Sequence, residues 1–317
     1  MTSTLLTCTS STRPGSPAAG DTLFETDTNK IIVYSGSDWE VYDSDGSTYA
    51  LDGSNILTQS PIFHFDAGKI NGTDATGNPS NGVAFSGVWT SKVNGIKTFA
   101  QGTATKQPTW NTSGTNSQAY IESDGGDELE IDFRSSLNIP NSGAFTLFGV
   151  VKRNGSGHIV LGGTAKANYN IYPAGSTQGI WMGYSSGSDY LMYNQTGSDN
   201  GAHPTFASGS GNGSTAVSTY DVTRLFMVVR DSSNNTRLFV DGNNTNSSNV
   251  ATVSAEVLVE RLLNNSGYRT TGQTYEVGYF NGDLSTADKN TLISYVNSRY
   301  GTGRNADDTD DLARATF

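Results

Sequence analysis

The sequence predicts an all-β protein, a β-sandwich with one C-terminal helix. Of its 317 residues, 37 are glycine, 34% are hydrophobic and only 15% are charged, which is typical of short strands joined by polar turns. Apolar runs are separated by clusters of Ser, Thr, Asn, Asp and Gly, the pattern of strand and turn. Aromatic residues make up 10% of the chain and supply side chains for a core, so we do not expect a disordered protein.

The stretch Thr223–Asp241 gives the clearest strand signal. Two apolar runs, Leu225–Val229 and Leu238–Val240, flank the polar turn Asp231–Asn235, which predicts an antiparallel hairpin. Because the apolar residues are unbroken rather than alternating, both faces of these strands should be covered. Ala144–Val151 has the same character, so we expect both runs in interior strands of a sheet.

The N-terminal region predicts a small β-meander. Three short strands are expected at Leu23–Thr26, Ile31–Tyr34 and Trp39–Tyr42, and such a meander buries little surface alone. Successive side chains of a strand point to opposite faces, so its apolar residues cannot all be inside, and an exposed apolar face often marks an interface. We therefore expect residues 1–45 to form an attachment or oligomerisation module that uses Leu23, Phe24, Ile32, Tyr34, Trp39 and Val41.

A large domain is expected at residues 61–301, after a linker at 46–60 and before an acidic tail at 302–317. Val250–Leu263 fits a helix and a strand equally well. Ser285 is a suitable N-cap and Gly301 a suitable C′ residue for a helix. Pro61–Asp66 opens this domain, and a polar stretch that begins at Pro108–Trp110 ends at Ala119–Glu122. Further strands are expected at Gly82–Trp89, Ile96–Phe99, Tyr169–Tyr172, Gly179–Tyr184, Tyr190–Tyr193 and Thr274–Phe280. The apolar stripe of the helix should be Leu292, Ile293, Val296 and Tyr300.

Charge and composition exclude several classes of protein. The net charge of -11, without basic patches, argues against nucleic-acid binding. No apolar run approaches 18 residues, so no membrane insertion is expected, and the N-terminus lacks the basic and apolar regions of a secretion signal. Cys8 is the only cysteine, which rules out a disulfide within the chain.

Two resemblances follow from sequence motifs. The string from Arg13 to Trp39, with its Thr-Asn-Lys turn and Gly-x-x-Trp spacing, resembles a short module of phage tail-fibre and other virion structural proteins. The range 61–301 resembles the laminin-G-like domains of the concanavalin A-like lectin/glucanase superfamily, through Asp124–Leu129, Phe145–Lys152, Val228–Gly242 and Tyr275–Gly301. These resemblances imply a jelly-roll sandwich on the exterior of a bacteriophage virion, made in the host cytoplasm, and a homotrimer.

The acidic strand DELEID is the candidate for catalysis. Glu128, Glu130 and Asp132 alternate and would share one face, as in laminarinase-type glucanases, where paired carboxylates cleave a glycosidic bond. Their order departs from the usual glucanase pattern, and the preceding DGGD matches the non-catalytic laminin-G-like pattern instead. We therefore expect solvent-facing acids, with Leu129, Ile131 and Phe133 pointing inward, and no enzyme.

Binding residues are harder to assign. Trp181, Tyr184, Tyr190 and Tyr193 are candidates for stacking on sugars, with core packing as the alternative for about half of them. His64, His158 and His203 lack metal-ligand spacing and are expected in turns or at the surface. No cofactor is expected. Some laminin-G-like relatives bind calcium, and the oxygen ligands that could do so here are Asp66, Asp74, Asn78, Asp124 and Asp127. The alternative is that these residues simply form Asx turns.

The function expected is that of a non-enzymatic virion surface protein, a fibre or decoration of head or tail, which displays a lectin-like domain. Its partners would be other virion proteins, capsid or tail, and a host-surface glycan. The alternatives are a glycan depolymerase acting through Glu128, Glu130 and Asp132, and a cement protein between capsomers.

Overall fold

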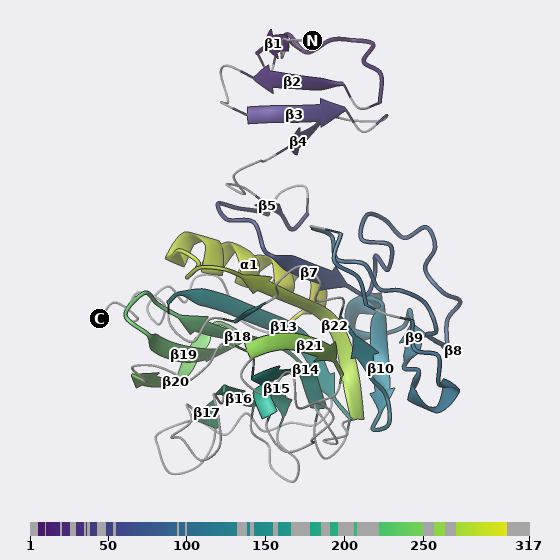
Figure 1. Ribbon diagram of the computed structural model, residues 1–317, viewed down its shortest axis with the longest axis vertical. Helices are drawn as coiled ribbons and strands as arrows, with labels where there is room; N and C mark the ends of the chain where they lie inside the picture. Colours follow the sequence, from purple (N-terminus) through teal and green to yellow (C-terminus); the bar gives the residue numbers. More distant parts are fainter. Residues whose placement is uncertain are drawn as a thin grey trace.

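The computed structural model describes most of the predicted large domain and part of the N-terminal module. The residues it describes are 6–9, 11–19, 21–25, 30–34, 36, 39–42, 49–52, 55–93, 95–98, 100–131, 138–139, 143–154, 158–165, 178–184, 191–195, 206–207, 222–249, 257–263 and 271–302. Across them the chain forms two packed antiparallel sheets and one α-helix, which confirms the predicted sandwich with a C-terminal helix (Figure 1).

The larger sheet has nine strands in the described part of the chain. Eight of them lie in the order β20 (Asn243–Asn249), β19 (Asn235–Val240), β18 (Thr223–Arg230), β13 (Phe145–Arg153), β22 (Thr271–Phe280), β10 (Tyr120–Asp124), β9 (Thr109–Asn111) and β8 (Val83–Ala84). The ninth, β7 (Phe63–Asp66), pairs with β22 beyond the end of β10. Both β13 and β18 are interior strands, as their apolar sequences predict.

The second sheet packs on one face of the first. Its path is β11 (Leu129–Glu130), β21 (Val257–Leu262), β14 (His158–Ala165), β15 (Gln178–Tyr184), β16 (Leu191–Gln195) and β17 (Phe206–Ala207), and β12 (Asn138–Ile139) also pairs with β21. Within the ambiguous segment Val250–Leu263, Val257–Leu262 is therefore a strand, and residues 250–256 lie outside the described residues. The strand expected at Gly82–Trp89 is shorter than predicted, and the one expected at Tyr169–Tyr172 lies outside the described residues.

Strand β18 explains why its sequence is apolar at consecutive positions. Phe226 and Val228 join the core between the two sheets, whereas Leu225 and Met227 join a second core beneath the helix. Each face of the strand is thus covered by a different layer, and the larger sheet is the middle layer of three. Figure 1 shows the helix lying along the outer face of this sheet.

Helix α1 spans Thr286–Tyr300, as its capping residues predict. The Ser285 hydroxyl accepts the backbone N–H of Asp288 at 3.1 Å, and Gly301 adopts the left-handed conformation at φ 65°. Four buried residues form the predicted stripe: Leu292, Ile293, Val296 and Tyr300. Two single-turn 3₁₀ helices, η1 (Ala104–Lys106) and η2 (Thr115–Ser117), lie in the connections of the large sheet.

A β-bulge in β22 changes the alternation of its side chains. Val150 of β13 pairs with Glu276, but the next residue, Val151, pairs with Thr274, so Tyr275 is the extra residue. As a result Tyr275 and Glu276 both contact the helix side of the sheet: the Tyr275 ring lies 5.2 Å from that of Tyr300, whose hydroxyl donates to Glu276.

The N-terminal strands form a separate four-stranded sheet, ordered β1 (Leu6–Cys8), β2 (Thr22–Glu25), β3 (Lys30–Tyr34) and β4 (Trp39–Tyr42). The three antiparallel strands were predicted; β1, parallel to β2, was not. Figure 1 shows this sheet beyond the helix, apart from the sandwich.

The hairpin β5 (Tyr49–Ala50) and β6 (Ile56–Leu57), within the range expected to be a linker, packs on the sandwich. Tyr49, Leu51 and Leu57 are buried in the core beneath the helix. Thr58 donates its backbone N–H and its hydroxyl to Asp288 of α1. The described part of 46–60 is therefore held to the sandwich by both apolar and polar contacts.

Candidate functional site

A polar pocket of about 300 Å³ opens where four strands of the large sheet end or begin. Strand β10 contributes three of the eight lining residues, and β9, β22 and the end of β13 lie beside it. The lining residues are Gln107, Thr109, Glu122, Ser123, Asp124, Asp127, Asn154 and Thr271. The strand register brings these residues together. Glu122 of β10 pairs with Thr109 of β9 on one side, and Asp124 of β10 pairs with Thr271 of β22 on the other.

Alternation along β10 explains why two of its acidic side chains lie on one face of the sheet. Tyr120 belongs to the core beneath the helix, and Ile121 belongs to the core between the sheets. Glu122 and Asp124 follow Tyr120 at every second position, so they lie on its face of the sheet, in the part that bears the pocket rather than the helix core. Amide groups hold Glu122 in place: Asn154 donates to it at 3.0 Å and Asn111 at 3.5 Å.

The turn after β10 places one further carboxyl group, that of Asp127, in the pocket beside Asp124. Asp127 accepts the backbone N–H of Asp124 at 2.8 Å, and Asp124 accepts that of Gly126 at 2.9 Å. Asp127 is only 5% exposed. Burial raises the pKa of the Asp127 carboxyl, and the neighbouring Asp124 charge raises it further, against the lowering effect of the backbone hydrogen bond.

The acidic strand DELEID is divided between two environments. Leu129 and Ile131 point into the core, as predicted, and Glu130 is exposed. Glu128 was expected to face solvent, but this prediction is wrong: it is 6% exposed and forms ion pairs with Lys106 at 2.5 Å and Arg261 at 3.4 Å. The two cations offset the burial of its charge. Asp132 and Phe133 lie outside the described residues.

The five oxygen ligands considered for calcium do not gather in one place. Asp66 is buried under the helix, Asp74 and Asn78 belong to a surface loop, and Asp124 and Asp127 line the pocket. Asp74 accepts the backbone N–H of Thr76, the hydrogen-bonding pattern of an Asx turn. Within the described ranges, no three His, Cys, Asp or Glu side chains are grouped as metal ligands.

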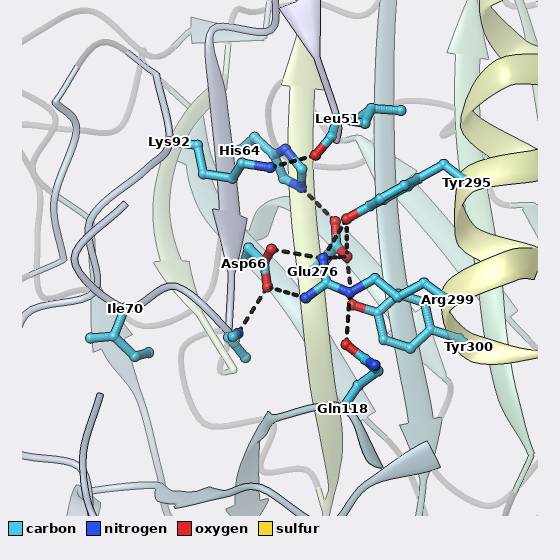
Figure 2. A network of polar contacts seen from close by, with 12 residues as sticks. Leu51, His64, Asp66, Ile70, Lys92, Gln118, Glu276, Tyr295, Arg299 and Tyr300 are labelled. Carbon is cyan, nitrogen blue, oxygen red and sulfur yellow. Dashed lines mark hydrogen bonds and ion pairs between the residues drawn. The ribbon is translucent and has the colours of Figure 1, made fainter. Parts of the chain in front are cut away.

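A second polar cluster, absent from the sequence analysis, lies between the large sheet and α1 (Figure 2). Glu276 is fully buried and accepts hydrogen bonds from Tyr295 at 2.8 Å and Tyr300 at 2.5 Å. Arg299 pairs with it at 2.9 Å and with both oxygens of Asp66, at 2.8 and 3.0 Å. We call the side chains His64, Asp66, Glu276, Tyr295, Arg299 and Tyr300 the buried network.

His64 extends this network to the N-terminal side. It was expected in a turn or at the surface, but it is a β7 residue with no exposed surface, so that prediction is wrong. Its Nε2 atom lies 2.6 Å from Glu276, and its Nδ1 atom lies 2.9 Å from the Tyr49 hydroxyl. Burial lowers the pKa of His64, which keeps the ring neutral, so Nε2–H donates to Glu276 and Nδ1 accepts from Tyr49.

The buried network has the residue types of an active site but the geometry of a structural one. Burial alone would raise the pKa of Glu276. The Arg299 charge and the His64 hydrogen bond outweigh this effect and lower the pKa to about 2, so the carboxylate stays ionised. His64, Asp66 and Glu276 have no exposed surface, and none of the three lines the pocket. Because substrate has no access to them there, we assign the network to holding α1 on the sheet.

The remaining predicted site residues have less structural information. Trp181 and Tyr184 are on β15 and Tyr193 is on β16, but their side chains, and all of Tyr190, lie outside what the structure describes. In the N-terminal sheet Leu23 is buried, and the rings of Tyr34 and Trp39 lie 5.4 Å apart on paired positions. Phe24, Ile32 and Val41 are strand residues whose side chains are outside the description.

In the described part of the chain, no helix combines the length and the apolar character that crossing a bilayer requires. No protein-family model matches the chain, and neither does any curated protein.

Solved structures give matches to the fold. The binding domain of botulinum neurotoxin serotype D is similar, with a TM-score of 0.50 and 8% identity over 74% of this chain and 50% of that one. The binding domain of Paraclostridial Mosquitocidal Protein 1 gives a TM-score of 0.43 and 12% identity over 75% of this chain and 52% of that one. The chain thus spans about half the length of these structures. The serotype D likeness shows a shared β-sandwich fold.

Proposed function

We propose that this chain is a non-enzymatic glycan-binding protein of a virion surface, in which the sandwich binds sugar in the polar pocket. The observation that supports this most is the lining of the pocket: carboxylate, amide and hydroxyl side chains on adjacent strands. Sugars present many hydroxyl groups, and such side chains both donate and accept hydrogen bonds to them. The strands fix Glu122 and Asp124 before ligand arrives, which limits the entropy lost on binding.

The fold is compatible with this role. The similar structure of botulinum neurotoxin serotype D is named as a binding domain, so a sandwich of this kind is able to present a recognition site. The virion context rests on the resemblance of the N-terminal module, and so do attachment to the particle and trimer formation.

Catalysis is not part of the proposal. A glycosidase of the usual kind needs two carboxyl groups facing one glycosidic bond. Glu128 is instead buried between Lys106 and Arg261, while Glu130 is exposed. The pair therefore lacks a shared face open to substrate.

The test is a glycan array followed by calorimetry on the full chain. Glycans of the host surface should bind, and the variants Glu122→Gln and Asn154→Ala should weaken binding by about 10-fold, the effect of one lost hydrogen bond to a charged group. Glu130→Gln is the matched control, because it removes an exposed carboxylate outside the pocket. Binding that survives both pocket variants, or no binding to any glycan, would contradict the proposal.

Two further measurements test the rest of the function. Reducing-sugar release from host capsule that disappears in Glu130→Gln would establish the depolymerase instead. Light scattering should give three times the chain mass, and deleting residues 1–45 should give a folded monomer. A truncated chain with an unchanged oligomeric state would show that the N-terminal module is not the oligomerisation element.

A further inference from the structure

Asparagine followed by glycine is a sequence that deamidates without an enzyme. The backbone nitrogen of the glycine forms a bond to the side-chain amide carbon of the asparagine. The amide nitrogen leaves with the displaced proton as ammonia, which closes a succinimide ring. Water then opens the ring at either carbonyl, and the product is aspartate or isoaspartate. Glycine favours the reaction because it has no Cβ to hinder the approach of its nitrogen.

Three Asn-Gly pairs lie wholly within the described residues, and their surroundings differ. They are Asn71 with Gly72, Asn81 with Gly82, and Asn281 with Gly282. Since the following residue is glycine in every case, any difference in reactivity between them in the folded protein must come from the structure. Hydrogen bonds of the glycine nitrogen and of the asparagine side chain are the features to compare.

The first pair is held by hydrogen bonds at both reacting groups. Asn71 Oδ1 accepts the backbone N–H of Thr73 at 2.9 Å and that of Asp74 at 3.0 Å, and its Nδ2 donates to the Asp74 carboxylate at 2.9 Å. Gly72 is buried, and its N–H donates to the Lys69 carbonyl at 2.8 Å. Neither group is available for the reaction unless this loop opens locally.

The second pair is held in the same way. Asn81 Oδ1 accepts the backbone N–H of Thr112 at 2.8 Å and its hydroxyl at 3.1 Å. The Gly82 N–H donates to the Trp110 carbonyl at 2.9 Å. Although both residues of this pair are exposed, their hydrogen bonds would have to open before the ring could close. Exposure alone therefore does not make this pair reactive.

The third pair lacks this protection. Asn281 is exposed, in the turn between β22 and α1. Among the interactions made by the described residues, none involves the Asn281 side chain or the Gly282 N–H. The attacking nitrogen and the amide it attacks thus have no bond to give up.

We propose that Asn281 is a site of spontaneous deamidation in the folded protein, and that it reacts faster than Asn71 and Asn81. The rate should be at least about 10-fold higher, because a local opening that breaks one or two hydrogen bonds is populated only a small fraction of the time.

The product alters the turn that leads into α1. The Thr146 hydroxyl donates to the Gly282 carbonyl at 2.9 Å and accepts the backbone N–H of Leu284 at 3.1 Å. Isoaspartate adds one carbon to the main chain directly before Gly282, which shifts this carbonyl away from Thr146. The isoaspartate form should therefore show faster hydrogen exchange in the first turn of α1.

Peptide mapping by mass spectrometry on the full chain tests the proposal. The protein is incubated at mildly alkaline pH in water enriched in heavy oxygen, which labels each site that converts. Label should enter the Asn281 peptide at least about 10-fold faster than the peptides of Asn71 and Asn81, which are internal controls. In urea the protecting bonds are lost, so the three peptides should convert at similar rates. The variant Asn281→Gln is the matched control for the effect on α1, because its longer side chain forms the ring far more slowly.

Several outcomes would overturn the proposal. Equal rates at the three sites of the folded chain would show that the hydrogen bonds give no protection. Conversion of Asn281 in urea but not in the folded chain would show that the turn keeps the Gly282 nitrogen away from the side chain. A difference that persists in urea would assign it to neighbouring sequence instead of the fold. Hydrogen exchange in α1 that increases on incubation as much in Asn281→Gln as in the parent would refute the effect on the helix.

Discussion

The buried network makes a quantitative prediction for Arg299→Met. Arg299 forms two bonds to Asp66 and one to Glu276, and these carboxylates are 1% and 0% exposed. Methionine fills similar space without charge, so both carboxylates would remain buried without their main cation. Glu276 would keep its bonds from His64, Tyr295 and Tyr300, but Asp66 would keep only the backbone N–H of Gly68 among the bonds described.

Removing one partner of a buried ion pair costs about 3–5 kcal/mol of unfolding free energy. For a domain of this size that corresponds to a fall in melting temperature on the order of 10 °C. Urea unfolding followed by tryptophan fluorescence measures the loss. The control is Lys289→Met on the same helix, where Lys289 pairs with the more exposed Asp283 at 2.9 Å and the expected loss is below about 1 kcal/mol.

A second substitution tests the mechanism. Adding Asp66→Asn to Arg299→Met removes one of the two uncompensated charges with little change in shape. The double variant should be more stable than Arg299→Met alone, because the effects of groups in contact are not additive. The reasoning fails if Arg299→Met costs no more than the Lys289 control, or if the double variant loses the sum of the two single effects.

Three further predictions concern the same layer. In Gly278→Ala, the new methyl group would lie 2.1 Å from the Phe148 ring, so we expect a loss of about 1–3 kcal/mol, partly restored by Phe148→Leu; a neutral effect in urea unfolding would contradict this packing. Ser285→Ala removes the N-cap and should cost about 1 kcal/mol, whereas Ser285→Thr, which keeps the hydroxyl that accepts from the Asp288 N–H and donates to its carboxylate, should retain most of the stability. Acidification should destabilise the fold, because burial lowers the pKa of His64 and, against burial, Arg299 lowers that of Glu276 to about 2. In both cases the unfolded chain binds more protons than the folded one. Stability should therefore fall as the pH drops below about 6.5 for His64, and from about pH 4.5 towards 2 for Glu276, by up to about 1.4 kcal/mol per pH unit for each group. Unchanged melting temperatures across pH 7–4 would refute this.

The layered fold was predictable because burial leaves a direct trace in sequence. Leu225–Val229 is apolar at every position since α1 covers one face and the second sheet covers the other. The helix was predictable from Ser285, Gly301 and the apolar stripe, all of which are local signals. Strand β1 escaped prediction because Leu6–Cys8 has only three residues and pairs in parallel with a distant segment.

The buried network was not predicted because its geometry depends on a bulge and on contacts between distant residues. Regular alternation would place Tyr275 and Glu276 on opposite faces, and the bulge places both under the helix. His64 and Glu276 are separated by 212 positions. One signal was nevertheless present: a charged or titratable residue stands inside each of two strongly apolar strands, Phe63–Asp66 and Tyr275–Phe280. A buried charged residue requires a partner, so the presence of one in each strand indicates that the two strands lie close together and that these residues pair.

Strand β22 contributes to both the pocket and the buried network. It begins with Thr271, which lines the pocket, and it also carries Glu276 of the network. The network fixes this strand against α1 through Arg299, and the pairing of Thr271 with Asp124 fixes β10 relative to it. The carboxyl groups of Glu122 and Asp124 are therefore placed by a strand of the sheet rather than by a loop. A binding site built in this way is preorganised, so ligand binding should require little rearrangement of the protein.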